Sequence, residues 1–235
     1  MKPLPIRALP RAFVLGIESE LPESIELPNE EFKKFHDVLR LRSGAEIAIL
    51  PGDGRLIRCR MEGRSAVPLE VVAPQTESPV RLTLALAYPK PDKLDESLRM
   101  ATEMGAAAFV LFPSRRSVVK WDEEKLKSKQ RRWEAIIREA AEVSFRTHLP
   151  TLGFVKDLTS VLAQFPHAQI LSEVEGVPRV YAASGSPCLV VGPEGGWDPR
   201  EVAEIGYRAI TLGPRVLRVD TAVAAGCALA LLHTP

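Results

Sequence analysis

Apolar residues follow two different patterns along this chain, and the change from one to the other divides it. In the first third, short apolar runs are separated by turn residues such as Pro51-Gly52-Asp53-Gly54, which is typical of β-strands in a small sheet or barrel. One segment in between, 29–41, places its apolar residues at helical spacing instead. The predicted strands of this part are residues 12–17, 46–50, 56–61 and 69–72.

A stretch rich in Pro, Ser and Thr, 74–79, precedes a region in which strands and helices alternate. Two nearly continuous apolar runs, 80–88 and 106–112, flank an amphipathic helix and form a βαβ unit. This alternation continues to the end of the chain and predicts a parallel sheet covered by helices on both faces. We therefore expect a β-rich domain over residues 1–73 and an α/β domain over residues 74–235. The helices are predicted at 92–104, 122–145, 198–207 and 220–233, and the later strands at 169–171, 187–191 and 209–212.

Composition narrows the possible classes of protein. The 235 residues carry a net charge of +1 and contain no run of about 18 apolar residues, so we expect no transmembrane helix, no membrane partner and a cytoplasmic location. The first ten residues are too poor in apolar side chains for a signal peptide. Cys59, Cys188 and Cys227 lie far apart and form no C-x-x-C pair, which favours reduced, buried thiols and no metal site.

Positive charge is concentrated in one segment, 114–148, which holds ten basic and six acidic side chains. Such a density suits contacts with nucleic-acid phosphates. A solvated helix face is the simpler interpretation of the lysines alone.

Two glycine-containing turns near the C-terminus are the most informative local feature. Each follows a short apolar strand and opens into a helix, and glycine lets backbone groups approach a ligand closely at the end of a strand. Neither turn contains the dinucleotide pattern G-x-G-x-x-G or the phosphate-binding pattern G-x-x-x-x-G-K-[ST]. An isolated turn of this kind is usually structural, but two in succession, each beside carboxylate and arginine side chains, favour a binding site. The turns are Gly192-Pro193-Glu194-Gly195-Gly196-Trp197 and Leu212-Gly213-Pro214-Arg215-Val216-Leu217-Arg218-Val219-Asp220.

Read together, these turns resemble the paired signatures of the RsmE family, whose members are SPOUT-superfamily methyltransferases acting on N3 of a uridine in 16S ribosomal RNA. The resemblance extends over nearly the whole chain, and its blocks occur in the family's order. The further similar blocks are residues 7–14, 36–41, 115–120 and 139–146.

The resemblance implies a PUA-like β-barrel that binds RNA, followed by a SPOUT-type knotted parallel sheet with helices on both faces. It also implies S-adenosylmethionine as cofactor, 16S ribosomal RNA or the small ribosomal subunit as partner, and a homodimer. By the same resemblance, the cofactor is held by Leu171, Glu173, Gly192, Glu194, Gly195, Gly196, Leu212, Gly213, Val216 and Leu217.

Methylation of uracil N3 requires a base for its proton and a cation for the charge that develops on O2 and O4. Glu201 and Asp220 are the candidate bases, and Arg218 is the candidate cation. Both carboxylates also suit the first turn of a helix, where they would cap N–H groups or complement the helix dipole. The alternative role for Glu194 is to organise the first turn. The alternative role for Arg218 is that of a partner in a structural ion pair.

The expected RNA contacts are basic residues in the similar blocks, which suit binding to phosphates. Trp197 suits either stacking on a base or filling a gap in the packing. The chain departs from the family at three positions, where it has Asp220 for the common glutamate, Val143 for glutamine and Phe145 for glycine. The candidate RNA contacts are Arg7, Arg11, Arg40, Arg115, Arg116, Lys120 and Arg146.

Two other functions remain as alternatives. In the first, the chain binds ribosomal RNA as a non-enzymatic assembly factor, and the glycine turns only shape the fold. In the second, it hydrolyses a nucleotide phosphate, which the missing phosphate-binding loop and metal cluster disfavour.

Overall fold

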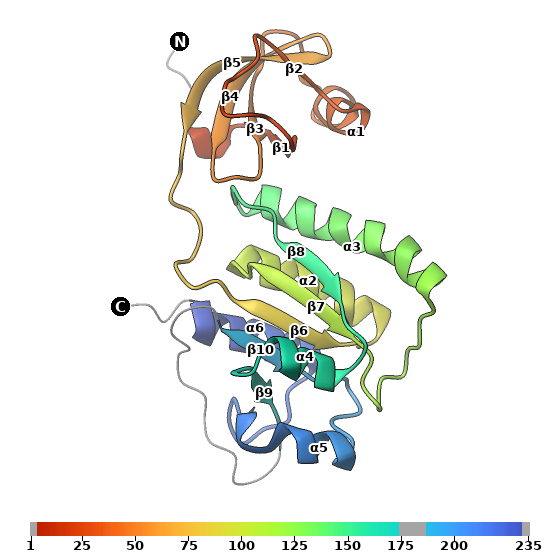
Figure 1. Ribbon diagram of the computed structural model, residues 1–235. Helices are drawn as coiled ribbons and strands as arrows, with labels where there is room; N and C mark the ends of the chain where they lie inside the picture. Colours follow the sequence, from red (N-terminus) through yellow and green to blue (C-terminus); the bar gives the residue numbers. More distant parts are fainter. Residues whose placement is uncertain (1–3, 174–186, 232–235) are drawn as a thin grey trace. The chain divides into compact units, whose positions relative to one another are not determined.

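The computed structural model describes residues 4–173 and 187–231, which form two compact units (Figure 1). The first unit comprises Met1–Glu77 together with Ala141–Leu149, and the second comprises Ser78–Ala140 and Pro150–Pro235. The segment 141–149 thus joins the N-terminal unit although it lies far along the chain. No local sequence pattern indicates this return.

The first unit is built on a five-stranded sheet in the order β1-β3-β4-β5-β2. β1 runs parallel to β3, and all other neighbours are antiparallel, so the sheet is mixed. Its buried core contains side chains from every strand, including Ala12, Ile25, Ile47, Ile57 and Ala66. The strands are β1 (Arg11–Phe13), β2 (Ile25–Glu26), β3 (Glu46–Leu50), β4 (Leu56–Glu62) and β5 (Ser65–Val72), and a 3-10 turn, η1 (Ile6–Ala8), precedes them.

The helix predicted over 29–41 ends earlier and changes its winding. It consists of α1 (Asn29–Lys33) and a π-helical turn, η2 (Lys34–Val38). Arg40 follows with a φ of 56°, in the left-handed region that an L-residue other than glycine or asparagine rarely adopts, and this stops the helix. As a result Val38 is 73% exposed, whereas Phe35 is fully buried.

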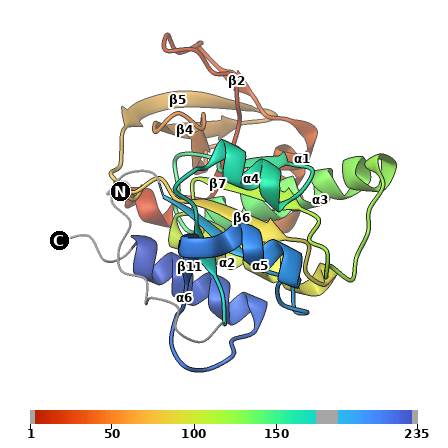
Figure 2. The ribbon, with the colours of Figure 1, turned by 60° about the horizontal axis from the view of Figure 1, so that its bottom comes forward.

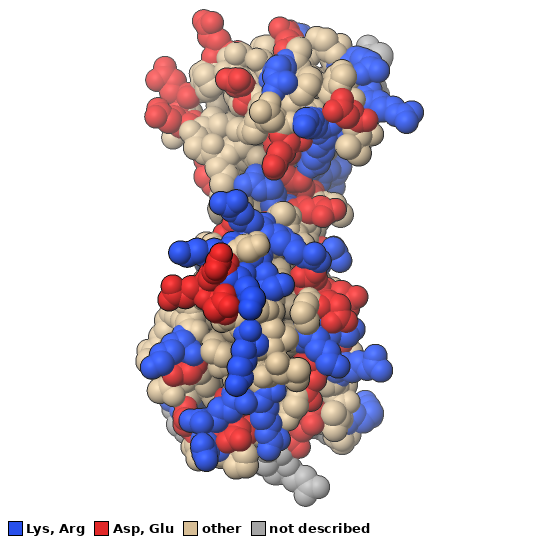
Figure 3. All heavy atoms as spheres, turned by 90° about the vertical axis from the view of Figure 1, so that its right-hand side faces the viewer, with Lys and Arg blue, Asp and Glu red and all other residues tan. Residues whose placement is uncertain are grey.

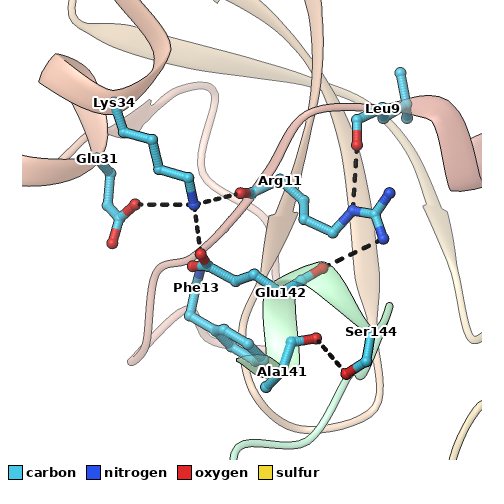
Figure 4. Close-up of polar contacts among 8 residues, drawn as sticks. All are labelled: Leu9, Arg11, Phe13, Glu31, Lys34, Ala141, Glu142 and Ser144. Atoms are coloured by element: carbon cyan, nitrogen blue, oxygen red, sulfur yellow. Dashed lines mark hydrogen bonds and ion pairs between the residues drawn. The ribbon is translucent and has the colours of Figure 1, made fainter. Parts of the chain in front are cut away.

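Glu142 connects the returning segment to the sheet of the first unit (Figure 4). Its side chain is almost fully buried and accepts a hydrogen bond from the backbone N–H of Phe13 at 2.9 Å. It also accepts one from the ammonium of Lys34, which donates to the carbonyl of Arg11 at 2.9 Å. One carboxylate therefore links α3, β1 and the helical segment of the unit.

The second unit contains a fully parallel sheet of six strands in the order β11-β9-β10-β6-β7-β8. Together with the mixed sheet of the first unit, this confirms the predicted fold class. The strands are β6 (Thr83–Ala87), β7 (Ala108–Phe112), β8 (Thr151–Phe154), β9 (Gln169–Leu171), β10 (Cys188–Val191) and β11 (Ala209–Ile210). The helices are α2 (Pro91–Met104), α3 (Glu123–Val143), α4 (Leu158–Gln164), α5 (Pro199–Ile205) and α6 (Val219–Leu231), with a 3-10 turn, η3 (Gly206–Arg208), after α5.

Helices cover both faces of this sheet (Figures 1 and 2). Val110 and Val190 belong to a core cluster that includes Leu158 of α4 and Ile205 of α5. On the opposite face, α6 approaches so closely that a Cβ on Gly226 would lie 2.4 Å from Cδ2 of Leu189. Strands buried on both faces account for the continuous apolar runs seen here in place of alternation.

Strand order brings three loops together. β9, β10 and β11 are neighbours in one parallel sheet, so the loops that follow them leave the same edge. Residues 174–186, between β9 and β10, lie outside the described residues, and the knotted threading of the chain stays a prediction.

All three cysteines are free and buried, and burial raises the pKa of each thiol to about 12. Within residues 4–173 and 187–231, no group of His, Cys, Asp and Glu side chains is arranged to hold a metal ion. None of the helices in this part of the chain is long and apolar enough to cross a membrane.

Candidate active site

A cavity of about 820 Å³ lies in the second unit where the loops after β9, β10 and β11 meet. Most of the residues predicted from the resemblance to bind a cofactor line it; the exceptions are Gly195 and Gly213. Lys90 and Lys93 also line it, although the sequence did not single them out. The lining segments are residues 171–173, 191–194, 196–197, 211–212 and 215–219, together with Val202 and Ala222.

Trp197 fixes two of these loops to each other. Its Nε1 donates a hydrogen bond to the carbonyl of Leu171 at 2.8 Å, which ties the turn after β10 to the end of β9. Its ring packs directly over Gly192, where a Cβ would lie 2.9 Å from Cε2 of the indole. Of the two interpretations of Trp197, the structure therefore favours packing over base stacking.

Glycine stands at two adjacent positions of the turn, 195 and 196, for different physical reasons. Gly196 has a φ of 67° and donates its N–H to the carbonyl of Pro193 at 2.9 Å, so the turn needs a residue without a Cβ at this point. At Gly195 the reason is proximity, because a Cβ there would make a tight contact of 3.2 Å with the carbonyl oxygen of Arg116. Arg116 in turn donates from Nη1 to the carbonyl of Gly195 at 3.1 Å.

Glu194 fastens the same turn from its other side. Its carboxylate accepts a hydrogen bond from the backbone N–H of Lys90 at 3.0 Å, just before α2 begins. Both residues line the cavity, so this bond joins two of its walls.

Glu201 is a buried carboxylate whose oxygens are occupied by donors. It is 4% exposed and accepts hydrogen bonds from the hydroxyl of Ser114 and the N–H of Arg115, each at 3.0 Å. It also accepts from the N–H of Asp198 at 3.0 Å, completing the capping box of α5. Glu201 does not line the cavity, and its contacts are those of the capping alternative rather than of a base.

Asp220 forms an ion pair with Lys93. The ammonium lies 2.8 Å from Oδ2 of Asp220 and 3.3 Å from Oε2 of Glu96. The hydrogen bond from Lys93 lowers the pKa of the Asp220 carboxyl, and the same bond raises the pKa of Lys93. Lys93 and Arg218 line the cavity, whereas Asp220, like Glu201, is not among the lining residues and is joined to the cavity wall through its ion pair with Lys93. The sequence missed Lys93 because a lysine on an amphipathic helix normally faces solvent.

Three of the candidate RNA contacts, Arg115, Arg116 and Lys120, are exposed on the loop that precedes α3. Arg116 touches the Gly195 turn, so this loop adjoins the cavity. Figure 3, which views the side of the molecule where α3 begins, shows lysine and arginine side chains gathered over that side, with acidic side chains among them.

The first unit carries the other candidates, in three different settings. Arg40 and Arg7 are exposed, and Arg7 and Arg11 pack over the Phe145 ring, 5.3 and 4.6 Å from its centre. Burial lowers the pKa of Arg11, whose guanidinium also donates to the carbonyls of Leu9 and Glu142, as Figure 4 shows.

Arg146 is placed differently from the prediction that it contacts RNA. It is 4% exposed, and its guanidinium donates to Glu77 at 3.1 Å from Nε and 2.6 Å from Nη2. Glu77 also accepts from the backbone N–H of Thr147 and His148. This buried ion pair holds residues 146–148 within the first unit and leaves Arg146 no surface for a phosphate.

Comparisons with known proteins agree with this geometry. The model of the RNA methyltransferase domain family matches residues 76–231. The chain is 36% identical over 205 residues to the ribosomal RNA small subunit methyltransferase E of Mycobacterium tuberculosis, covering 80% of this chain and 78% of the relative. It is 30% identical over 235 residues to the protein of the same name from Bacillus subtilis, covering 90% and 92%. The crystal structure of a ribosomal RNA small subunit methyltransferase E from Neisseria gonorrhoeae, bound to S-adenosyl methionine, superposes with a TM-score of 0.83 at 27% identity, covering 94% of this chain and 95% of that one.

Proposed function

From its membership of the family of ribosomal RNA small subunit methyltransferases E, to which this chain belongs, we propose that it methylates N3 of a uridine in 16S ribosomal RNA, with S-adenosylmethionine as methyl donor. The observation that carries the proposal is the cavity at the meeting point of the three loops after β9, β10 and β11. We further propose that the protein acts in the cytoplasm as a homodimer, with residues 1–73 as a PUA-like RNA-binding domain and 74–235 as the methyltransferase domain.

The residues of the cavity fit S-adenosylmethionine. Its volume of about 820 Å³ is within the range of small-molecule sites, and Leu171, Leu212 and Leu217 supply apolar walls. Glu173 and Glu194 supply two carboxylates, which suit the sulfonium and ammonium groups of the ligand, and four basic residues line the same cavity: Lys90, Lys93, Arg215 and Arg218. When bound, this cofactor supplies an electrophilic methyl group on sulfur. The close packing at Gly192 and Gly195 shows that the loops are shaped without room for larger side chains.

Methylation of uracil N3 requires the protein's own residues to remove the N3 proton and to stabilise the charge that develops on the uracil oxygens. N3 carries a proton and is paired in a duplex, so the base has to be unpaired or flipped into the site. We assign the N3 proton to the carboxylate of Asp220, which Lys93 keeps ionised, and the developing charge on the uracil oxygens to Arg218. Glu201 then has no part in proton transfer, because its oxygens already accept three hydrogen bonds.

Basic residues then bind the RNA backbone. The exposed Arg115, Arg116 and Lys120 are in the unit that holds the cavity, and the exposed Arg7 and Arg40 and the partly buried Arg11 are in the first unit. Phosphate contacts position the substrate without reading its sequence, so recognition of the particular uridine needs its bases or its folded shape as well.

The test is methyl transfer to ribosomal RNA. Purified protein is incubated with S-adenosylmethionine and either 16S RNA or small subunits from a strain that lacks the chain, and the modified nucleotide is located by mass spectrometry. We expect one N3-methyluridine, which blocks the pairing edge and therefore stops reverse transcriptase. Arg218→Ala is expected to lower kcat, whereas Arg200→Ala, an exposed arginine outside the cavity, is a matched control.

Two results would overturn the proposal. Methylation of a different atom would refute the assigned substrate. Tight RNA binding without methyl transfer and without calorimetric heat from S-adenosylmethionine would favour the assembly factor.

A further inference from the structure

The loop that precedes α3 and the glycine turn after β10 are joined by one buried carboxylate. Glu201 accepts from Ser114 and Arg115 of the loop and from Asp198 at the end of the turn. We propose that Glu201 is a positioning residue that couples cofactor binding to RNA binding. This inference rests on the proposed function, in which the turn holds S-adenosylmethionine and Arg115 and Arg116 hold RNA.

The contacts of Glu201 fix the loop and the turn relative to each other, so that a shift of one shifts the other. Oε2 accepts the Ser114 hydroxyl and the N–H of Asp198, and Oε1 accepts the N–H of Arg115, each at 3.0 Å. Because the carboxylate is 4% exposed, water cannot readily replace these donors. A displacement of the loop would leave buried donors or a buried charge without partners.

A second connection makes the linkage rigid. Arg116 donates to the carbonyl of Gly195 at 3.1 Å, and its own carbonyl oxygen is so close to Gly195 that a Cβ there would lie only 3.2 Å away. Within the loop, the hydroxyl of Ser117 accepts from the N–H of Ser114 at 3.1 Å. The loop and the turn therefore meet at two points, one beside each binding surface.

Two ligands that order the same pair of segments affect each other's affinity. A cofactor held by the turn fixes the position of Gly195 and, through Arg116 and Glu201, the loop that carries the arginines. RNA held by those arginines fixes the turn by the same contacts. Because coupling free energy is reciprocal, each ligand is expected to tighten the other by the same factor, on the order of tenfold.

The experiment measures the dissociation constant of the product S-adenosylhomocysteine by calorimetry, with and without a saturating 16S RNA fragment, and the RNA affinity with and without that product. Glu201→Gln keeps the size of the side chain but turns one acceptor oxygen into a donor that faces other donors. Glu204→Gln, on the same helix, exposed and bonded only to Thr159 in the described residues, is the matched control. We expect about tenfold coupling in the wild type and in Glu204→Gln, and less than about threefold in Glu201→Gln.

If Glu201 served only as a helix cap, its replacement would lower stability without changing the ratio of the dissociation constants measured with and without the second ligand. Full coupling in a folded Glu201→Gln protein would therefore overturn the inference. If that variant does not fold, Ser114→Ala removes one donor and is expected to reduce the coupling by a smaller factor; unchanged coupling there would equally refute it. If the wild-type protein binds both ligands independently, the coupling is refuted and the proposed function still stands. Failure to bind S-adenosylhomocysteine at all would sink the proposed function with it.

Discussion

Gly192→Ala tests whether packing of the turn after β10 maintains the cavity. The φ of Gly192 is not in the left-handed region, so the backbone itself accepts alanine. The obstacle is Trp197, whose Cε2, Cζ2 and Nε1 would lie 2.9, 3.1 and 3.3 Å from the new methyl group. A contact of 2.9 Å between carbon atoms is not tolerated, and the indole is held by its bond to Leu171. The ring therefore has to move and strain or break that bond.

The magnitude follows from these two effects. Overpacking by one methyl group costs about 1–3 kcal/mol, and a weakened neutral hydrogen bond adds about 1 kcal/mol. Trp197 and Leu171 both line the cavity, so we expect part of this cost to appear in binding. A loss of about 1.4–2.7 kcal/mol corresponds to roughly 10- to 100-fold weaker binding of S-adenosylhomocysteine.

Calorimetry on a double-mutant cycle isolates the cause. In a Trp197→Leu background the indole atoms are gone, so Gly192→Ala is expected to have little further effect, giving an interaction energy of about 1.4–2.7 kcal/mol. Gly153→Ala is the matched control, because the nearest atom to its Cβ would be 3.9 Å away. If Gly192→Ala binds the product within about twofold of the wild type, or weakens it equally in both backgrounds, the argument is refuted.

Three further substitutions test other contacts. Glu142→Ala is expected to lower the free energy of unfolding in urea by about 2–4 kcal/mol, because a buried backbone donor and a partly exposed ammonium lose their acceptor. Glu139→Ala, at an exposed position on the same helix, is expected to change it by less than about 0.5 kcal/mol. Phe145→Gly relieves the backbone strain of a φ of 62°, about 1–2 kcal/mol, but removes a buried ring that stabilises the fold by about 3–5 kcal/mol. A net loss of stability is therefore expected, and a stabilised variant would contradict this. Lys93→Met is expected to raise the pKa of Asp220, measured by carbon NMR titration, because its hydrogen bond lowers that pKa. The pair's contribution is present above the ordinary pKa of an aspartate and is lost as pH falls through the lowered one; an unchanged titration would show that Lys93 is not the cause.

Much of the second unit could be predicted from sequence because its strands are buried on both faces. Continuous apolar runs such as those of β6 and β7, when helical segments alternate with them, are typical of the central strands of a parallel sheet. β8 and α4 escaped prediction because Thr151–Phe154 and Leu158–Gln164 are short and only partly apolar. The order in which the strands pair follows from long-range packing, which no local period records.

The returning segment of the first unit shows a different limit. Glu142 lies in a long, charged helix, where a glutamate normally indicates the solvent side. Its burial depends on Phe13 and Lys34, which are more than a hundred positions away in the chain. The burial of Arg146 was not predicted for the same reason, because its partner Glu77 belongs to the predicted linker, far away in the chain. A buried charge can be recognised only when its partner is known.

The two candidate bases are the clearest case of what the fold adds. In sequence Glu201 and Asp220 have the same description, an acidic residue in the first turn of a helix after a glycine turn. In the structure, Glu201 accepts three hydrogen bonds inside the protein, whereas Asp220 is bonded to a lysine of the cavity wall. A buried carboxylate whose oxygens accept three hydrogen bonds from within the protein holds the donating segments in place. Hydrogen-bond partners, rather than sequence position, therefore distinguish the two carboxylates and support the proposal that Asp220, not Glu201, takes the N3 proton.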